Sequence, residues 1–171
     1  MKNYRIQLAL FAFILLSGRA MSQSYDVPVS LKLEKAEDYK QYEKNVINCV
    51  KWLEATPVNE ETEKRLSANK FLITWIEGAP NVSIMITFNV TSFSEKNPEL
   101  LMSFMGGWTK YVLETGDTTQ LKGNLAGVQS AIRVYKNNTK NLKKDKKMEE
   151  LIKISDEGKL EEWVKTQLAK T

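Results

Sequence analysis

The chain has 171 residues, with 25 Lys and Arg, 21 Asp and Glu, one cysteine and no histidine. The absence of histidine excludes Ser-His-Asp and Cys-His catalysis and histidine-ligated zinc, and one cysteine excludes an intramolecular disulfide or a cysteine-only metal site. With 42% hydrophobic and 27% charged residues, the composition is that of an ordinary globular protein. We expect neither a metal ion nor another cofactor.

Residues 1–22 have the pattern of a secretory signal peptide. Lys2 and Arg5 precede an apolar stretch over 6–16, and Ala20-Met21-Ser22 gives small residues at the usual cleavage spacing. The apolar stretch is far shorter than the roughly 20 residues that a membrane span needs. We therefore expect an exported protein, periplasmic or extracellular, with no transmembrane segment after signal cleavage near Gln23.

Signal cleavage would also change the charge balance of the chain. It would remove three basic residues and no acidic one, so the net charge would fall from +4 to about +1. The basic balance of the whole chain is therefore no indication of nucleic-acid binding. The remaining length suits one domain, and we expect an extended lead-in over 23–35 followed by a single helical domain over 36–171.

Two helices are predicted in the first half of the domain. Apolar residues recur every three or four positions over Ala36–Ala55, and Pro57 ends that pattern. A second helix is expected from about Glu60 to Glu77, where Gly78 and Pro80 form a stop signal. Its expected inward-facing residues are Leu66, Phe71, Leu72, Trp75 and Ile76.

The segment Val82–Val90 is ambiguous. Apolar and polar residues alternate strictly, which favours a strand, but the only candidate partner strand is the weakly alternating lead-in. A lone strand would leave its backbone unpaired. We therefore expect a helix or a short extended connector at this position.

A central helix is predicted from Asn97 to Glu114. Asn97 can cap it, Pro98 fits the first turn, and Gly116 ends it. Because the segment is apolar on nearly every face, we expect it to be buried in the middle of the domain. A helix over about Thr118–Lys136 and two short amphipathic helices separated by Gly158 follow. The sequence thus predicts an all-α fold, a compact bundle of five or six helices.

Glycines and one alanine mark where two helices are expected to pack closely. Gly106 and Gly107 lie in the central helix, and Gly123, Gly127 and Ala131 follow at four-residue spacing in the next one. Glycine inside a helix costs about 1 kcal/mol relative to alanine, and close helix packing could offset that loss. The alternative is that Gly106 and Gly107 open the helix near a ligand.

These helices also carry the motifs of a resemblance. Phe104–Tyr111, with the sequence FMGGWTKY, and Gly123–Gly127, with the sequence GNLAG, resemble a family of small exported proteins from Bacteroidota without an assigned activity. The resemblance extends from about Trp52 to Trp163. It implies an all-helical exported domain and brings no substrate, cofactor or catalytic residue.

Several residues could bind a ligand or partner if they line a cleft. Aromatic residues such as Trp75, Trp108 and Trp163 are expected first as core side chains. Lys110 and Asn124 are polar residues within the closely packed pair, where they have either a structural role or the task of holding an anionic or amide-bearing ligand. The candidate binding residues are Trp75, Trp108, Lys110, Tyr111 and Asn124.

Other patterns give weaker hypotheses. Ser67 and Lys70 match the S-x-x-K pattern of penicillin-recognising enzymes without the companion motifs, and a pair such as Glu77 with Glu99 could perform acid–base hydrolysis. Cys49 lies on an apolar stripe and is expected to be a buried thiol. A basic run forms a solvated surface or contacts anionic lipid or polysaccharide. This run consists of Lys136, Lys140, Lys143, Lys144, Lys146 and Lys147.

The function expected from these patterns is non-catalytic. We predict an exported helical module that binds an unknown partner protein or small ligand, and we assign no catalytic residue. The alternative is a small histidine-free hydrolase that uses carboxylates or a Ser/Lys pair.

Overall fold

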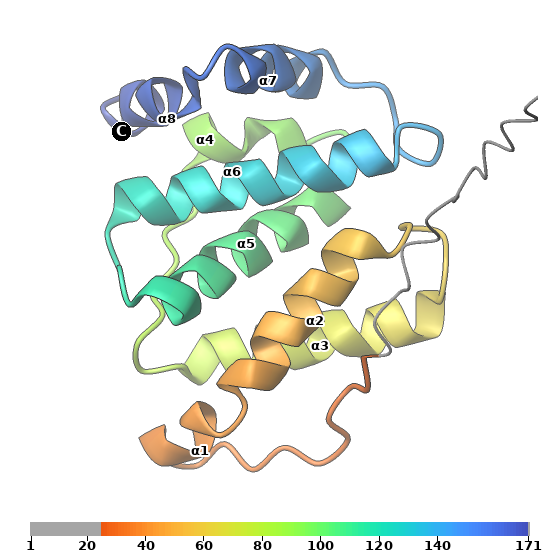
Figure 1. Ribbon diagram of the computed structural model, residues 1–171, viewed down its shortest axis with the longest axis vertical. Coiled ribbons are helices and arrows are strands. Elements are labelled where there is room, and N and C mark those ends of the chain that lie inside the picture. The colour runs from red at the N-terminus through yellow and green to blue at the C-terminus, as the bar shows by residue number, and fades with distance from the viewer. Residues whose placement is uncertain (1–24, 171) are drawn as a thin grey trace, which may run out of the picture.

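The computed structural model describes residues 25–170, whose regular elements are all helices, with no strand in that range (Figure 1). The all-α prediction is therefore confirmed, but the described residues contain eight α-helices where five or six were expected. The expected signal peptide over residues 1–22 lies outside the described residues. The elements are α1 (Ala36–Lys40), α2 (Glu43–Ala55), α3 (Thr62–Gly78), α4 (Phe88–Thr91), a 3-10 turn (Ser92–Ser94), α5 (Glu99–Thr115), α6 (Gln120–Asn137), α7 (Lys146–Asp156) and α8 (Leu160–Leu168).

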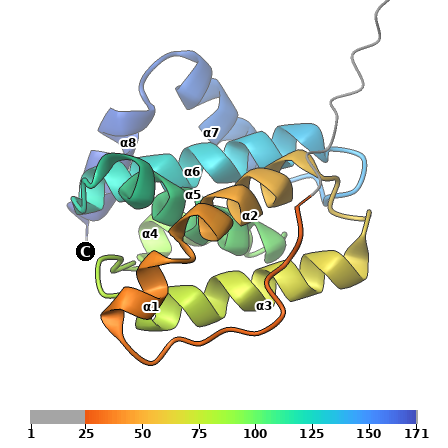
Figure 2. The same ribbon diagram turned by 60° about the horizontal axis from the view of Figure 1, so that its bottom comes forward.

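Helix α5 occupies the middle of the bundle. It packs along α6 on one side and against α2 and α3 on the other, while α7 and α8 lie across the far side of α6 (Figures 1 and 2). Its side chains at every fourth position, Leu100, Phe104, Trp108 and Val112, are buried. The continuous apolar character of this segment thus reflects neighbours on opposite sides.

The first predicted helix is two helices. Gln41 and Tyr42 separate α1 from α2, so the prediction of one helix over 36–55 is wrong. The indole nitrogen of Trp75 donates to the carbonyl oxygen of Tyr39 at 3.0 Å. In a continuing α-helix, this carbonyl oxygen would accept from the backbone N–H four residues later. The bend also brings the Tyr42 hydroxyl to the carbonyl oxygen of Ser30, at 3.4 Å.

Two further local expectations are wrong. Leu66 was expected to face inward but is 72% exposed; at about 100° per residue it lies almost opposite the buried Ala68, Phe71, Leu72 and Trp75. Asn97 does not cap α5. Its side chain instead donates to the carbonyl oxygen of Lys143 at 2.9 Å and accepts from the Lys143 amide at 2.8 Å, and so fixes the loop before α7.

The ambiguous segment is mostly an extended connector. Residues 82–87 form neither helix nor strand, and the short helix α4 begins at Phe88. The alternation in the sequence therefore corresponds to an irregular connector, since residues 25–170 contain no strand with which it could pair. None of the helices in this range is long and apolar enough to cross a membrane.

Candidate functional site

Helices α5 and α6 cross at glycines. A Cβ atom on Gly107 would overlap the Cβ of Ser130 and would lie 2.8 Å from the carbonyl oxygen of Ala126. A Cβ on Gly127 would lie 2.6 Å from the ring of Phe104 and 2.8 Å from its carbonyl oxygen. These distances are shorter than van der Waals contact, so only glycine allows this approach of the two backbones.

The remaining small residues of the two helices contact side chains. A Cβ on Gly123 would overlap the indole of Trp108, and Ala131 is completely buried. Gly106 faces away from α6, because its Cβ would meet Val50 at 3.2 Å and Leu72 at 3.3 Å. Both glycines of α5 are buried, and the small cavity that Gly106 lines, about 30 Å³ in volume, has no room for a ligand.

The predicted binding residues do not share a cleft. Trp75, Trp108 and Asn124 are fully buried, and the Asn124 side-chain amide donates to the Gln120 carbonyl oxygen of its own helix at 2.8 Å. Tyr111 lies at the surface, where its hydroxyl donates to Asp117 at 2.8 Å. A ligand could reach only Tyr111 and the edge of Lys110 without rearrangement of the core.

Lys110 belongs to a cluster of polar side chains around Glu54. The two carboxylate oxygens of Glu54 accept hydrogen bonds from Lys110 at 2.7 Å, Ser130 at 2.6 Å and Arg133 at 2.8 Å. Burial by itself would raise the pKa of Glu54, but these three donors outweigh it and leave the pKa below its usual value. Glu54 is therefore an ionised group that ties α2 to α5 and α6.

A small cavity lies beside this cluster. It has a volume of about 30 Å³ and is lined by Glu54, Ser130, Arg65 and Gly106, among others. That volume suits one water molecule and no larger ligand. Arg65 is occupied as well, because its guanidinium donates to the carbonyl oxygens of Leu53, Thr56 and Pro57 at the end of α2.

A larger site lies between the N-terminal segment and α3. We call residues 25–35 the arm; together with one face of α3 they enclose a groove of about 920 Å³. The arm is held by Tyr25, whose buried ring packs against Trp52 with a centroid distance of 6.2 Å. Tyr39 and Tyr42 hold its other end through hydrogen bonds to the Leu33 and Ser30 carbonyl oxygens.

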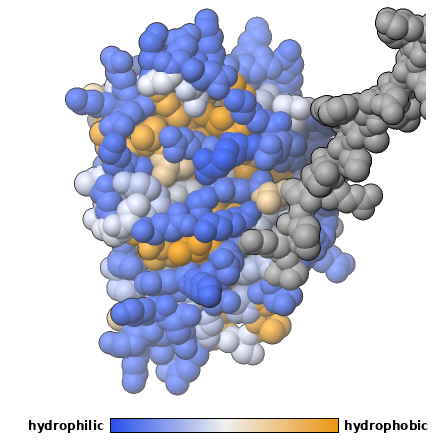
Figure 3. Space-filling view, in the orientation of Figure 1, coloured by the Kyte–Doolittle hydropathy of each residue, from blue (hydrophilic) through white to orange (hydrophobic). Residues whose placement is uncertain are grey.

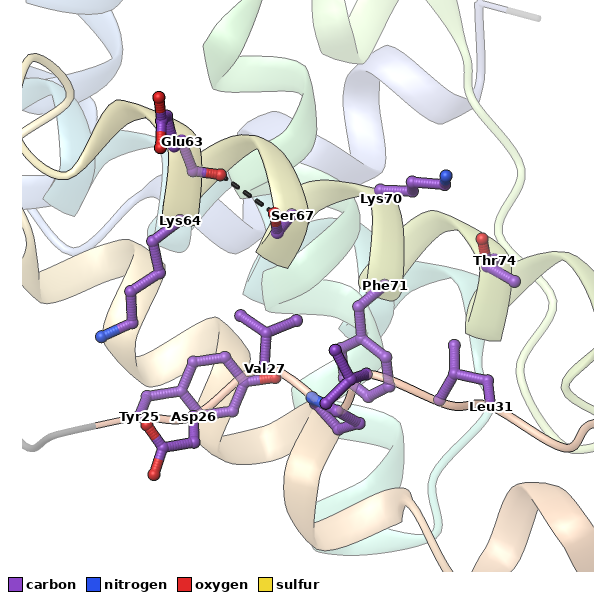
Figure 4. Close-up of a pocket in the computed structure, with 12 residues that line it drawn as sticks. Tyr25, Asp26, Val27, Leu31, Glu63, Lys64, Ser67, Lys70, Phe71 and Thr74 are labelled. Carbon is purple, nitrogen blue, oxygen red and sulfur yellow. Dashed lines mark hydrogen bonds between the residues drawn. The ribbon is translucent and has the colours of Figure 1, made fainter.

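The groove has an apolar floor and a polar rim (Figure 4). Val27 and Leu31 point from the arm toward α3, Phe71 points from α3 toward the arm, and Lys64 extends from α3 in the same direction. Lys64 also pairs with Glu61 at 3.3 Å and lies 4.8 Å from the ring of Trp52. The site thus combines apolar contact with donors at its edge.

Ser67 and Lys70 both line this groove, but they do not contact each other. The Ser67 hydroxyl donates to the carbonyl oxygen of Glu63 at 3.0 Å, and Lys70 points away from it (Figure 4). A lysine that activates a serine must lie within hydrogen-bond reach of its oxygen. The two residues therefore line the groove without forming a serine–lysine pair.

The other candidate groups are dispersed. Glu99 lines the small cavity but Glu77 does not, so the two carboxylates do not share a site there. Within residues 25–170, no cluster of three or more Cys, Asp and Glu side chains is placed to hold a metal ion. Cys49 is buried, and burial raises its pKa to about 12.

The basic run is partly neutralised. Lys136 pairs with Asp156 at 3.1 Å, Lys147 with Glu95 at 2.8 Å and, more loosely, Lys144 with Glu149 at 3.6 Å. The other three lysines, Lys140, Lys143 and Lys146, have no ion pair in the described part of the chain. Contact with an anionic surface stays a prediction that rests mainly on these three.

Sequence reasoning missed the groove. The signal was present as the alternation of apolar residues in the lead-in, which is typical of a segment with one face on an apolar surface. Val27, Leu31 and Leu33 do pack against the protein, whereas Val29 is fully exposed. Elsewhere, the face shown in Figure 3 is mainly hydrophilic with smaller apolar areas. Comparison with protein-family models, curated proteins and solved structures gives no match for this chain.

Proposed function

We propose that this chain is an exported, non-catalytic helical module that binds a partner protein or a small ligand, with the arm–α3 groove as its site. The observation that carries this proposal is the groove itself, about 920 Å³ in volume with an apolar floor. Ligand pockets of proteins have this size and this combination of apolar lining with a few polar groups. Export is supported by the signal-peptide pattern of residues 1–22.

The lining favours a small, mostly apolar ligand that also has a polar group. Val27, Leu31 and Phe71 provide the apolar surface, and burial of apolar area supplies about 25 cal/mol per Å². On the rim, Lys64 and Lys70 are balanced by Asp26 and Glu63. The balanced charges give no strong preference for an anionic or a cationic ligand, so apolar contact sets the affinity.

The hydrolase alternative has less support. Ser67 lacks a hydrogen bond from Lys70 in the described structure, and Glu54 is held ionised by three donors. A general acid needs a proton to give near neutral pH, and a carboxylate in this environment has none. The groove therefore supports binding better than catalysis.

A charge placed in the groove tests the proposal. Val29 lines the groove and is fully exposed, so Val29→Asp should leave the fold intact. With 8-anilinonaphthalene-1-sulfonate as the probe, followed by its fluorescence, we expect about tenfold weaker binding, equivalent to about 1.4 kcal/mol. Leu66→Asp is the matched control. Leu66 is exposed like Val29, but it lies on α3 and does not line the groove. Equal affinity of Val29→Asp and the parent would contradict the proposed site.

Export is tested separately. The full chain is produced in a bacterial host with an intact secretion pathway, and the N-terminus of the product is sequenced. A product that begins near Gln23 outside the cytoplasm is expected. A cytoplasmic product that keeps Met1 would exclude the exported assignment without affecting the groove.

A further inference from the structure

The connector between α3 and α4 exposes apolar side chains. Met85, Ile86 and Phe88 are 53%, 49% and 68% exposed, whereas Val82 and Thr87 are buried and fix the segment to the protein. In Figure 1 it is the yellow-green stretch that leads from the end of α3 to α4. Exposed large apolar residues that are adjacent in sequence are a recurrent feature of interaction surfaces.

The backbone of this connector lacks partners. Among residues 25–170, no hydrogen bond joins an N–H or a C=O of residues 82–86 to another group of the protein. The segment is neither helix nor strand, its last residue Thr87 has extended dihedral angles, and it is rich in β-branched residues, which pair readily as strands. A backbone segment with unused donors and acceptors is a template for strand addition.

Residues 82–88 form a palindrome in side-chain class. From Val82 to Phe88 the order is apolar, hydroxyl, Ile, Met, Ile, hydroxyl, apolar, with Met85 at the centre. If two copies pair as antiparallel strands about a two-fold axis at Met85, Ile84 of each copy lies opposite Ile86 of the other, and Met85 lies opposite its own copy. Thr87 ends the pairing, because it is buried and its carbonyl oxygen accepts from Val90 and Thr91 in α4. Apolar side chains then meet apolar ones at every position where they occur.

The charge distribution favours the same partner. No charged residue occurs between Ala79 and Ser94, in a chain in which 27% of residues are charged. Two copies can therefore approach along this segment without like-charge repulsion. Short uncharged segments with high strand propensity and no proline are typical of self-pairing sequences.

We propose that two copies of this chain associate by antiparallel pairing of residues 84–86, with the two-fold axis at Met85. The pairing uses the unpartnered backbone groups and covers Ile86 and Phe88. It shares no residue with the arm–α3 groove, so it stands or falls independently of the proposed binding function. A two-stranded contact of this length is marginal, and the dimer is accordingly weak and dependent on protein concentration.

Charge substitutions at the axis test both the dimer and its register. Because residue 85 lies opposite its own copy, Met85→Asp and Met85→Lys each place like charges together, and each should weaken dimerisation at least tenfold in sedimentation equilibrium. An equimolar mixture of the two variants places opposite charges together and should restore the dimer. Met85 is exposed, so both variants should keep the helical circular dichroism of the parent.

Leu66→Asp and Leu66→Lys are the matched controls, because Leu66 is exposed on α3 and outside the connector. They should dimerise like the parent, alone and mixed. A parent that is monomeric at millimolar concentration would overturn the proposal. So would residue-85 variants that dimerise as well as the parent, or a mixture that fails to restore what each variant loses.

Discussion

Replacing either glycine of the α5 pair by alanine should have opposite effects on stability. Within a helix, alanine is favoured over glycine by about 1 kcal/mol. At Gly106 the new methyl group would meet methyl groups of Val50 and Leu72 at 3.2 and 3.3 Å. Those side chains can shift by a few tenths of an ångström, so we expect Gly106→Ala to be neutral or to stabilise the fold by up to about 1 kcal/mol.

At Gly107 the obstacle is another helix. The methyl group would overlap the Cβ of Ser130 and lie 2.8 Å from the carbonyl oxygen of Ala126, both fixed by the α6 backbone. Relief requires α5 and α6 to separate along a crossing that also includes Gly127 and Phe104. Overpacking costs about 1–3 kcal/mol and more where backbone must move, so we take about 3–4 kcal/mol at this crossing. After the gain of about 1 kcal/mol in helix propensity, we expect a net loss of about 2–3 kcal/mol.

Thermal unfolding followed by circular dichroism checks the pair. A loss of this size should lower the Tm of Gly107→Ala by about 5–10 °C, while the Tm of Gly106→Ala should equal or exceed that of the parent. The two sites are adjacent in one helix, so differences in helix propensity and in the unfolded chain largely cancel between them. The reasoning is refuted if Gly107→Ala is as stable as Gly106→Ala.

Three further predictions concern buried polar groups. Glu54→Gln should cost about 2 kcal/mol of unfolding free energy at pH 7. Because the pKa of Glu54 is lowered in the folded protein, its carboxylate stabilises the fold only while it is ionised, so urea unfolding should show the difference from the parent shrinking below pH 4.5. A difference that does not depend on pH would contradict the ion cluster. Asn97→Ala removes both hydrogen bonds to Lys143 and should speed amide exchange in the loop before α7, with about 1–2 kcal/mol lost; unchanged exchange there would argue against the clamp. Cys49 should react with Ellman's reagent at pH 8 only on unfolding, since it is buried with a pKa of about 12; immediate reaction of the folded protein would show that the core near the arm opens readily.

The sequence predicted the helices better than it predicted what interrupts them. Periodic apolar residues are sufficient to place α3, α5 and α6 within about two residues of their observed ends. The local sequence does not indicate the break before α2. At that break the Tyr39 carbonyl oxygen accepts from the indole of Trp75, which lies 36 residues further along the chain. Asn97 likewise carries a local capping signal, but a loop 46 residues away uses its side chain.

The candidate site was harder to predict than the fold for the same reason. Glu54, Lys110 and Ser130 are far apart in sequence, and nothing in their local patterns indicates that they meet. Val29 and Lys70 line one groove only because the arm turns back along α3. Periodicity describes which face of a helix is buried, whereas a groove requires knowing which other segment lies beside that face.

The packing of α5 on α6 has a consequence for the order of folding. The most extensive helix contact of the described chain joins two consecutive helices, separated only by residues 116–119. Closing so short a loop costs little entropy, and local contacts of this kind form rapidly. We expect this hairpin to be structured in the folding transition state, so that changes within it alter the rate of folding, while changes in the late-docking arm alter mainly the rate of unfolding.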